Sequence, residues 1–100
     1  MRYPFAILGL AVAFAASAQN PPQRLGLCAA CHGERGTATA KSIPNLAGQN
    51  LEYLRSAIRQ YRSGARDVAA MRAATGMLSA AELDRMLQWY AARAPDRPAP

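Results

Sequence analysis

Two thiols and an imidazole lie together in the run Cys28-Ala29-Ala30-Cys31-His32. The whole chain of 100 residues contains two cysteines and one histidine, so this run holds all of them. Two cysteines at this spacing lie on neighbouring positions of one helical turn, and the imidazole follows at once. Such groups can bind a metal ion, form a disulfide, or add to the two vinyl groups of a flat prosthetic group.

The first two chemistries fit the sequence poorly. A structural zinc site needs four nitrogen or sulfur ligands, usually in two separated pairs, and this chain supplies three in one run. A redox-active C-x-x-C adjoins a βαβ pattern, which is missing here, and a disulfide closing so small a loop would leave the histidine unexplained. The order C-x-x-C-H instead predicts covalent attachment of a c-type haem through Cys28 and Cys31, with His32 facing the iron.

The N-terminal residues predict export. A positive charge at Arg2 precedes an apolar stretch over residues 5–16, and Ala16-Ser17-Ala18 is a typical cleavage site. We therefore expect a signal peptide over residues 1–18, rather than a retained membrane anchor, because the apolar stretch is short for a span. The expected location is the periplasm.

The remaining chain is long enough for one small domain, over residues 19–94, followed by a disordered, proline-rich tail over residues 95–100. A core this small often needs a ligand to stabilise it, and a covalently held haem would serve. The net charge of +6 comes almost entirely from arginine, with Lys41 as the single lysine. No nucleic-acid-binding module is visible, so nucleic acid is not an expected partner.

The pattern along the chain predicts helices joined by irregular loops. The first helix is expected to begin near Asn20, to carry the cysteine motif at its end, and to stop at Gly33 and Gly36. Residues 37–49 show no periodicity and predict a loop. A second helix is expected between a cap at Asn50 and a stop at Gly64. Its apolar stripe consists of Leu54, Ala57, Ile58 and Tyr61.

A last helix is predicted from a capping box, Ser79-Ala80-Ala81-Glu82, to Pro95. We expect Trp89 or Tyr90 to pack this helix against the first one near Gly26, where the missing side chain allows close approach. No strand pattern is present, so the expected fold class is all-α.

With these features the chain resembles the class I cytochromes c, especially the small periplasmic ones of bacteria, and one lobe of the two-haem members. The resemblance covers about residues 22–92. It implies a class I cytochrome c fold, with short helices and loops around one covalently bound haem. The matching stretches are Cys28-Ala29-Ala30-Cys31-His32-Gly33, Gly36, Pro44-Asn45-Leu46-Ala47-Gly48-Gln49, Tyr53-Leu54, Leu78-Ser79 and Trp89-Tyr90-Ala91.

The resemblance also implies roles for single residues. Cys28 and Cys31 would hold the haem by thioether bonds, and His32 would bind the iron through Nε2. The backbone carbonyl of Pro44 would accept a hydrogen bond from the other ring nitrogen of His32 and so fix the orientation of the ring. The sulfur of Met71 would be the second axial ligand of the iron.

Met77 is the alternative axial ligand, whereas Met86 lies among apolar residues of the last helix and is expected in the core. Relatives often carry proline near the ligand methionine, but residues 68–74 here form a helix readily. A short helix there would place Met71 on the same face as Thr75. If it presented Met71 wrongly, the sixth position of the iron would stay open.

The implied function is one-electron transfer in the periplasm, by a carrier that is not an enzyme. The alternatives are a haem-carrying subunit of a larger oxidoreductase, a gas- or peroxide-binding haem protein, and an exported helical module without haem. A stripe of arginines is either a solvated face, a source of charge for the haem propionates, or a surface that steers acidic redox partners. It consists of Arg55, Arg59, Arg62 and Arg66.

Overall fold

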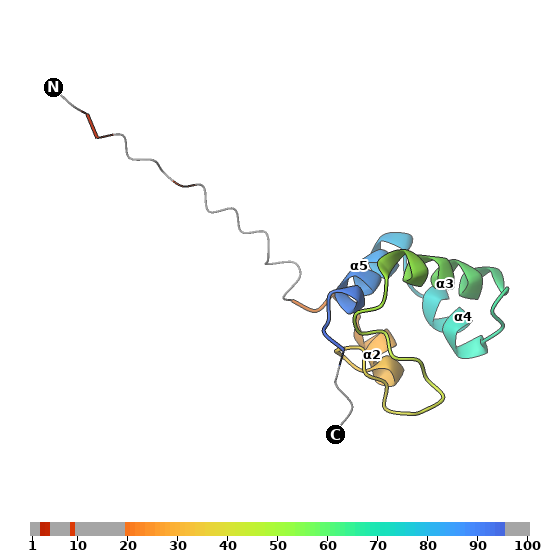
Figure 1. Cartoon of the computed structure of the whole chain (residues 1–100). Coiled ribbons are helices and arrows are strands. Elements are labelled where there is room, and N and C mark those ends of the chain that lie inside the picture. The colour runs from red at the N-terminus through yellow and green to blue at the C-terminus, as the bar shows by residue number, and fades with distance from the viewer. Residues whose placement is uncertain (1–2, 5–8, 10–19, 96–100) are drawn as a thin grey trace, which may run out of the picture.

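A computed structural model describes residues 3–4, 9 and 20–95 of the chain. The described residues form four helices and no strand (Figure 1), which confirms the all-α prediction. The predicted signal peptide and tail lie almost entirely outside the described residues and stay predictions. The helices are α2 (Gly26–His32), α3 (Leu51–Ser63), α4 (Ala69–Gly76) and α5 (Ala80–Ala91).

Helix α2 is shorter than the sequence predicts. It begins at Gly26 instead of near Asn20, because Arg24 has a φ of 66°, which no right-handed helix accommodates. Its end agrees with the prediction. Gly33 caps the helix with a φ of 78°, and its N–H donates to the carbonyl of Ala29 at 2.9 Å.

Helix α3 has the predicted bounds and caps. The side-chain oxygen of Asn50 accepts a hydrogen bond from the N–H of Tyr53 at 3.0 Å, and Gly64 ends the helix in the left-handed region. Leu54 and Ala57 of the predicted apolar stripe are buried. The stripe therefore faces the interior of the molecule.

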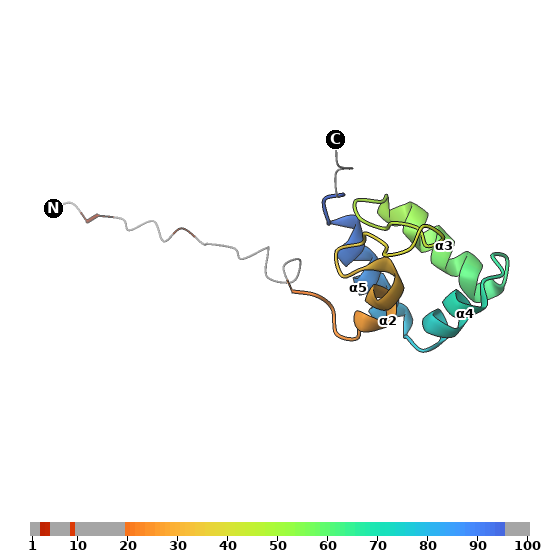
Figure 2. The same cartoon turned by 90° about the horizontal axis from the view of Figure 1, so that it is seen from below.

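Helix α5 begins with the predicted capping box, in which Ser79 and Glu82 bond to each other's backbone N–H. It ends at Ala91, four residues before Pro95, so the proline does not terminate it. The short helix α4 covers residues 69–76 and so overlaps most of the predicted region 68–74. Figure 2 shows α4 beyond one end of α2, and α3 beside both α4 and α5.

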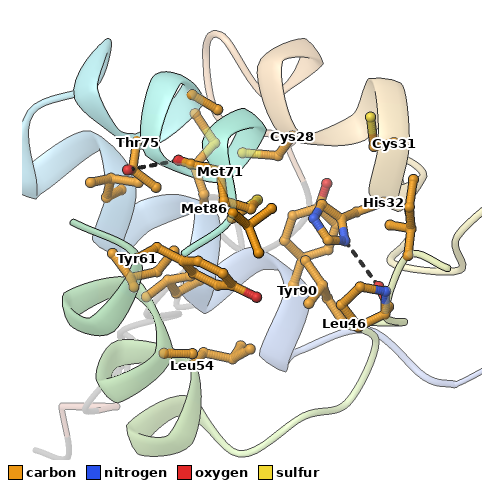
Figure 3. Close-up of a pocket in the computed structure, with 18 of the residues that line it drawn as sticks. Cys28, Cys31, His32, Leu46, Leu54, Tyr61, Met71, Thr75, Met86 and Tyr90 are labelled. Carbon is orange, nitrogen blue, oxygen red and sulfur yellow. Dashed lines mark hydrogen bonds between the residues drawn. The ribbon is translucent and has the colours of Figure 1, made fainter. Parts of the chain in front are cut away.

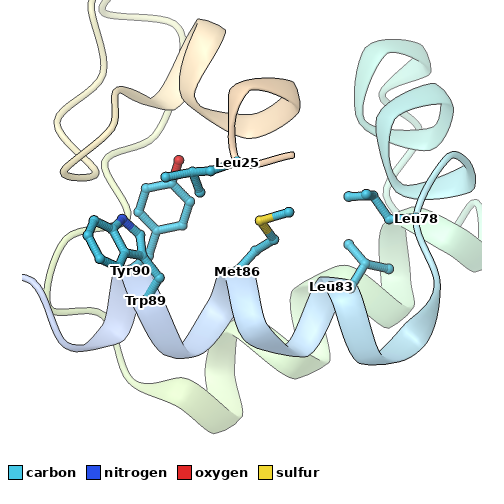
Figure 4. Packing of buried hydrophobic residues seen from close by; sticks show 6 residues of the cluster. All are labelled: Leu25, Leu78, Leu83, Met86, Trp89 and Tyr90. Atoms are coloured by element: carbon cyan, nitrogen blue, oxygen red, sulfur yellow. The ribbon is translucent and has the colours of Figure 1, made fainter. Parts of the chain in front are cut away.

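The core is a cluster of buried side chains that joins α5 to Leu25 at the start of α2 and to Leu78, two residues after the end of α4 (Figure 4). Trp89 and Tyr90 share this cluster with Leu25, so they lie near Gly26 as expected, but without the expected close approach to Gly26 itself. A β-carbon at Gly26 would meet nothing within 4 Å, so the backbone there is not closely approached. The cluster consists of Leu25, Leu78, Leu83, Met86, Trp89 and Tyr90.

The segment between α2 and α3 is irregular, as predicted, but its backbone is held at several points. The carbonyl of Gly36 accepts hydrogen bonds from the N–H groups of Leu46 and Ala47 at 2.7 and 3.1 Å. A β-carbon at residue 36 would lie 2.5 Å from the backbone nitrogen of Ala47, so only glycine fits. The N–H of Gly48 donates to the carbonyl of Tyr90 on α5 at 3.0 Å. These contacts fix the position of Pro44.

Candidate functional site

A cavity of about 350 Å³ opens between α2, the irregular segment and the three other helices. Its volume falls in the range of small-molecule and cofactor pockets, roughly 300–1,000 Å³. Figure 3 shows side chains from all four helices around this space. Most of the side chains that line it are apolar, among them Leu27, Leu46, Leu54, Ile58 and Leu83.

His32 is the last residue of α2 and lines this cavity, although only 6% of its surface is exposed to solvent. Its Nδ1 lies 2.9 Å from the carbonyl oxygen of Pro44 (Figure 3). Because a carbonyl only accepts hydrogen bonds, Nδ1 carries the proton and donates it. In the neutral form of the ring, the lone pair then lies on Nε2, and this nitrogen can bind a metal ion.

Both cysteines also line the cavity, and no disulfide joins them. Cys28 is half-buried, and its burial raises the pKa of the thiol, whereas Cys31 is exposed. Within residues 20–95, no three His, Cys, Asp or Glu side chains gather closely enough to hold one metal ion. The motif therefore presents its two sulfurs and its imidazole side by side along α2, and not around a common point.

The three described methionines differ sharply in their surroundings. Met71 lies on α4 and lines the cavity, and the hydroxyl of Thr75 donates to the backbone carbonyl of Met71 at 2.8 Å. Met77 is 58% exposed and is not among the cavity-lining residues. Met86 reaches the cavity wall but is 1% exposed inside the core cluster. Figure 3 shows Met71 on the α4 side and His32 on the α2 side.

The four arginines of the predicted stripe do not share one role. Arg55 is tied to α5, where its Nε donates to Asp84 at 2.7 Å, and it also pairs with Glu52 at 2.6 Å. Arg66 turns toward the cavity and lines it. Arg59 and Arg62 are exposed and have no ion pair among the described residues.

Sequence reasoning missed one part of the site. The cavity wall also includes Arg66, Tyr53 and Tyr61, and the contacts of Arg66 with the two tyrosines were not predicted from the sequence. The contacts of Arg66 with Tyr53 and Tyr61 depend on the turn after Gly64, which places Arg66 back against α3. The backbone N–H of Arg66 donates to the carbonyl of Gln60 at 3.1 Å in this turn.

The chemistry of these residues fits a haem. The cavity offers two unlinked thiols on one helical turn, an imidazole whose Nδ1 is hydrogen-bonded to Pro44 and a thioether, in a mostly apolar wall. No helix in the described part of the chain has the length and apolar character that a membrane span requires.

Comparisons with known proteins agree with this chemistry. A family model described as "cytochrome c oxidase, cbb3-type, subunit III" matches residues 23–89. Cytochrome c-554(548) of Halomonas halodenitrificans is 49% identical over 43 residues, which cover 43% of this chain and 52% of that protein. A thiosulfate dehydrogenase electron acceptor of Thiomonas intermedia is 35% identical over 106 residues, which cover 100% of this chain and 48% of that protein.

The chain thus spans about half the length of these two relatives. The family match covers the cysteine motif and every other cavity-lining residue except Tyr90. The chain belongs to this family of c-type cytochromes, and its cofactor is a covalently bound haem c.

Proposed function

We propose that this protein is a periplasmic one-electron carrier that breaks no bond in a substrate. In this proposal Cys28 and Cys31 hold the haem, and His32 and Met71 are the two axial ligands of the iron. The observation that carries the proposal is the pair of metal-binding side chains, His32 from α2 and Met71 from α4, in the wall of one mostly apolar cavity. The haem supplies an Fe(III)/Fe(II) couple.

The protein's own residues keep that couple suited to electron transfer. With an imidazole and a thioether provided by the chain, no coordination position is left for a substrate or a gas. Pro44 holds the His32 ring at a fixed orientation and tautomer through the 2.9 Å hydrogen bond. The apolar wall favours the less charged, ferrous state, and thioether ligation does the same. Little rearrangement then accompanies each transfer.

Export by a signal peptide over residues 1–18 is part of the proposal. The redox partners are proteins with an acidic docking surface. Arg59 and Arg62, exposed on α3 beside a shallow hollow between α3 and α5, are the basic residues that would meet this surface. The relative named as a thiosulfate dehydrogenase electron acceptor supports a dehydrogenase as the electron donor.

The test is voltammetry of protein matured in the periplasm, combined with exposure of the reduced protein to carbon monoxide. We expect a single reversible one-electron wave and a ferrous spectrum that carbon monoxide does not change. A spectrum that shifts on addition of carbon monoxide would instead assign the protein to the ligand-binding haem proteins. Electron exchange with a periplasmic dehydrogenase should slow as the ionic strength rises, because screening weakens attraction between exposed charges.

A further inference from the structure

Two aromatic side chains of α5 end in polar groups that reach out of the hydrophobic core. Trp89 is 7% and Tyr90 is 1% exposed, and both belong to the buried cluster (Figure 4). The indole Nε1 of Trp89 donates to the backbone carbonyl of Glu34 at 2.7 Å. The hydroxyl of Tyr90 donates to the carbonyl of Gly33 at 2.9 Å. The buried donors of α5 are thus bonded to two successive backbone carbonyls.

These two carbonyls directly follow His32 in the chain. The backbone turns sharply here, since Gly33 has a φ of 78° at the end of α2. A β-carbon at residue 33 would overlap the backbone carbonyl of Thr37, so the turn accepts only glycine at this position. A shift of the turn would move the last residue of α2, and the imidazole with it.

The same turn is tied to the segment that carries Pro44. The carbonyl of Gly36 accepts a hydrogen bond at 2.7 Å from the N–H of Leu46, two residues after the proline. The N–H of Gly48 then donates at 3.0 Å to the backbone carbonyl of Tyr90. These bonds close a ring that runs from α5 through the turn and the irregular segment and back to α5.

The hydrogen bond between His32 and Pro44 spans this ring (Figure 3). Its donor residue adjoins Gly33, and its acceptor lies two residues before Leu46, so each end is close to a point at which the ring is fixed. The 2.9 Å separation of Nδ1 from the carbonyl oxygen is therefore determined by contacts that neither His32 nor Pro44 makes itself.

We propose that Trp89 and Tyr90 position the imidazole of His32. They hold the two carbonyls after it and so keep its hydrogen bond to Pro44 short. The inference rests on the proposed function, in which His32 is an axial ligand of the haem iron. An acceptor at the outer nitrogen raises the basicity of a metal-binding imidazole. Because a more basic ligand stabilises the ferric state more than the ferrous one, the two aromatic residues should lower the reduction potential.

The test compares two variants of the matured holoprotein that each weaken the same core cluster. Trp89→Phe removes the N–H donor and keeps an aromatic ring in its place. Leu25→Val removes one methylene group from the cluster, and Leu25 is not part of the cavity wall. The measurements are the midpoint potential, by voltammetry, and the rate at which the Nδ1 proton of His32 exchanges with deuterium, by NMR of the ferrous protein.

We expect Trp89→Phe to raise the midpoint potential above that of the wild type. Exchange of the Nδ1 proton should become roughly two- to tenfold faster, as the loss of one net hydrogen bond would make it. Leu25→Val should keep the wild-type potential, and its Nδ1 exchange should change no more than its global stability does. Equal shifts of the potential in the two variants, or no shift in Trp89→Phe, would overturn the inference.

Tyr90→Phe is a second test that does not depend on how well Trp89→Phe folds. It removes the donor to Gly33, the residue next to His32, and should raise the potential in the same direction. Lower stability of both phenylalanine variants without any shift of the potential would mean that the two side chains act on the fold alone, which would overturn the inference. A wild-type protein without covalent haem would overturn the proposed function instead.

Discussion

The Nδ1 atom of His32 lies 2.9 Å from the carbonyl oxygen of Pro44, twelve residues further along the chain. This hydrogen bond joins the last residue of α2 to the irregular segment and determines which ring nitrogen faces the cavity. Proline restricts the backbone at the acceptor. The carbonyl of Gly36 holds the same segment by accepting hydrogen bonds from the N–H groups of Leu46 and Ala47.

Pro44→Ala should therefore loosen the imidazole without removing its acceptor. We expect a loss of about 0.4–1 kcal/mol in the free energy of unfolding, because alanine gives the unfolded chain more freedom. We also expect a changed ferric spectrum, since the ring orientation is less restricted. Pro21→Ala, which replaces an exposed proline before α2, is the control for the stability effect alone. Identical ferric spectra for wild type and Pro44→Ala would contradict this role of Pro44.

Met71→Ala should open the sixth coordination position of the iron. Ferrous protein with this change should bind carbon monoxide in a one-to-one ratio, whereas the wild type should not bind it. Two controls keep the test specific. Met77→Ala changes an exposed methionine outside the cavity wall, and Met86→Leu removes a core sulfur at nearly constant volume. Carbon monoxide binding by either control but not by Met71→Ala would move the ligand assignment to that residue.

Tyr90→Phe tests how α5 holds the end of the cysteine motif. The buried hydroxyl of Tyr90 donates to the carbonyl of Gly33 at 2.9 Å, and phenylalanine fills the same space without this bond. We expect a loss of about 0.5–1.5 kcal/mol in the free energy of unfolding, measured by denaturant titration. An unchanged denaturation midpoint would mean that this bond does not stabilise the fold.

Acid should weaken the contact between α3 and α5. Arg55 holds the pKa of Asp84 at about 2, below its ordinary value of 3.8, chiefly through their hydrogen bonds. Because the folded-state pKa is the lower one, the ionised carboxylate stabilises the fold above about pH 4. This contribution is lost as the pH falls from 4 toward 2.

The melting temperature of Asp84→Asn should accordingly lie below that of the wild type at pH 7, with the difference shrinking between about pH 4 and 2. Asp67→Asn is the matched control, since the side chain of Asp67 is 83% exposed and its pair with Arg72 lies at the surface. If the difference in melting temperature between wild type and Asp84→Asn stays constant down to pH 2, the stabilising role given to the ionised Asp84 carboxylate is contradicted.

Local signals in the sequence predicted much of the fold. The caps at Asn50, Gly64 and Ser79 gave correct helix ends because each acts through hydrogen bonds to neighbouring residues. The start of α2 could not be predicted in this way. Arg24 adopts a positive φ that its residue type does not favour, and its side chain pairs with Glu82 of α5, which is distant in sequence.

The same distinction between local signals and distant contacts applies to the site. The cysteine motif is local, so its residues and chemistry were visible in the sequence, whereas Met71 was implied by the resemblance to the class I cytochromes c. The contacts of Arg66 were not visible in the sequence, which indicated only that this residue extends an arginine stripe past Gly64. It lies beyond the end of α3, and the turn after Gly64 redirects it toward Gln60 and Tyr53.

The central claim is that Cys28 and Cys31 bond permanently to one haem, and the mass of the protein tests it most directly. Protein matured in the periplasm is denatured, extracted with acidified solvent and measured by mass spectrometry. The account predicts the mass of the polypeptide plus one haem, and loss of the haem on extraction of a variant with both Cys28→Ala and Cys31→Ala. A bare polypeptide mass, from cells that attach haem to another c-type cytochrome, would contradict the claim.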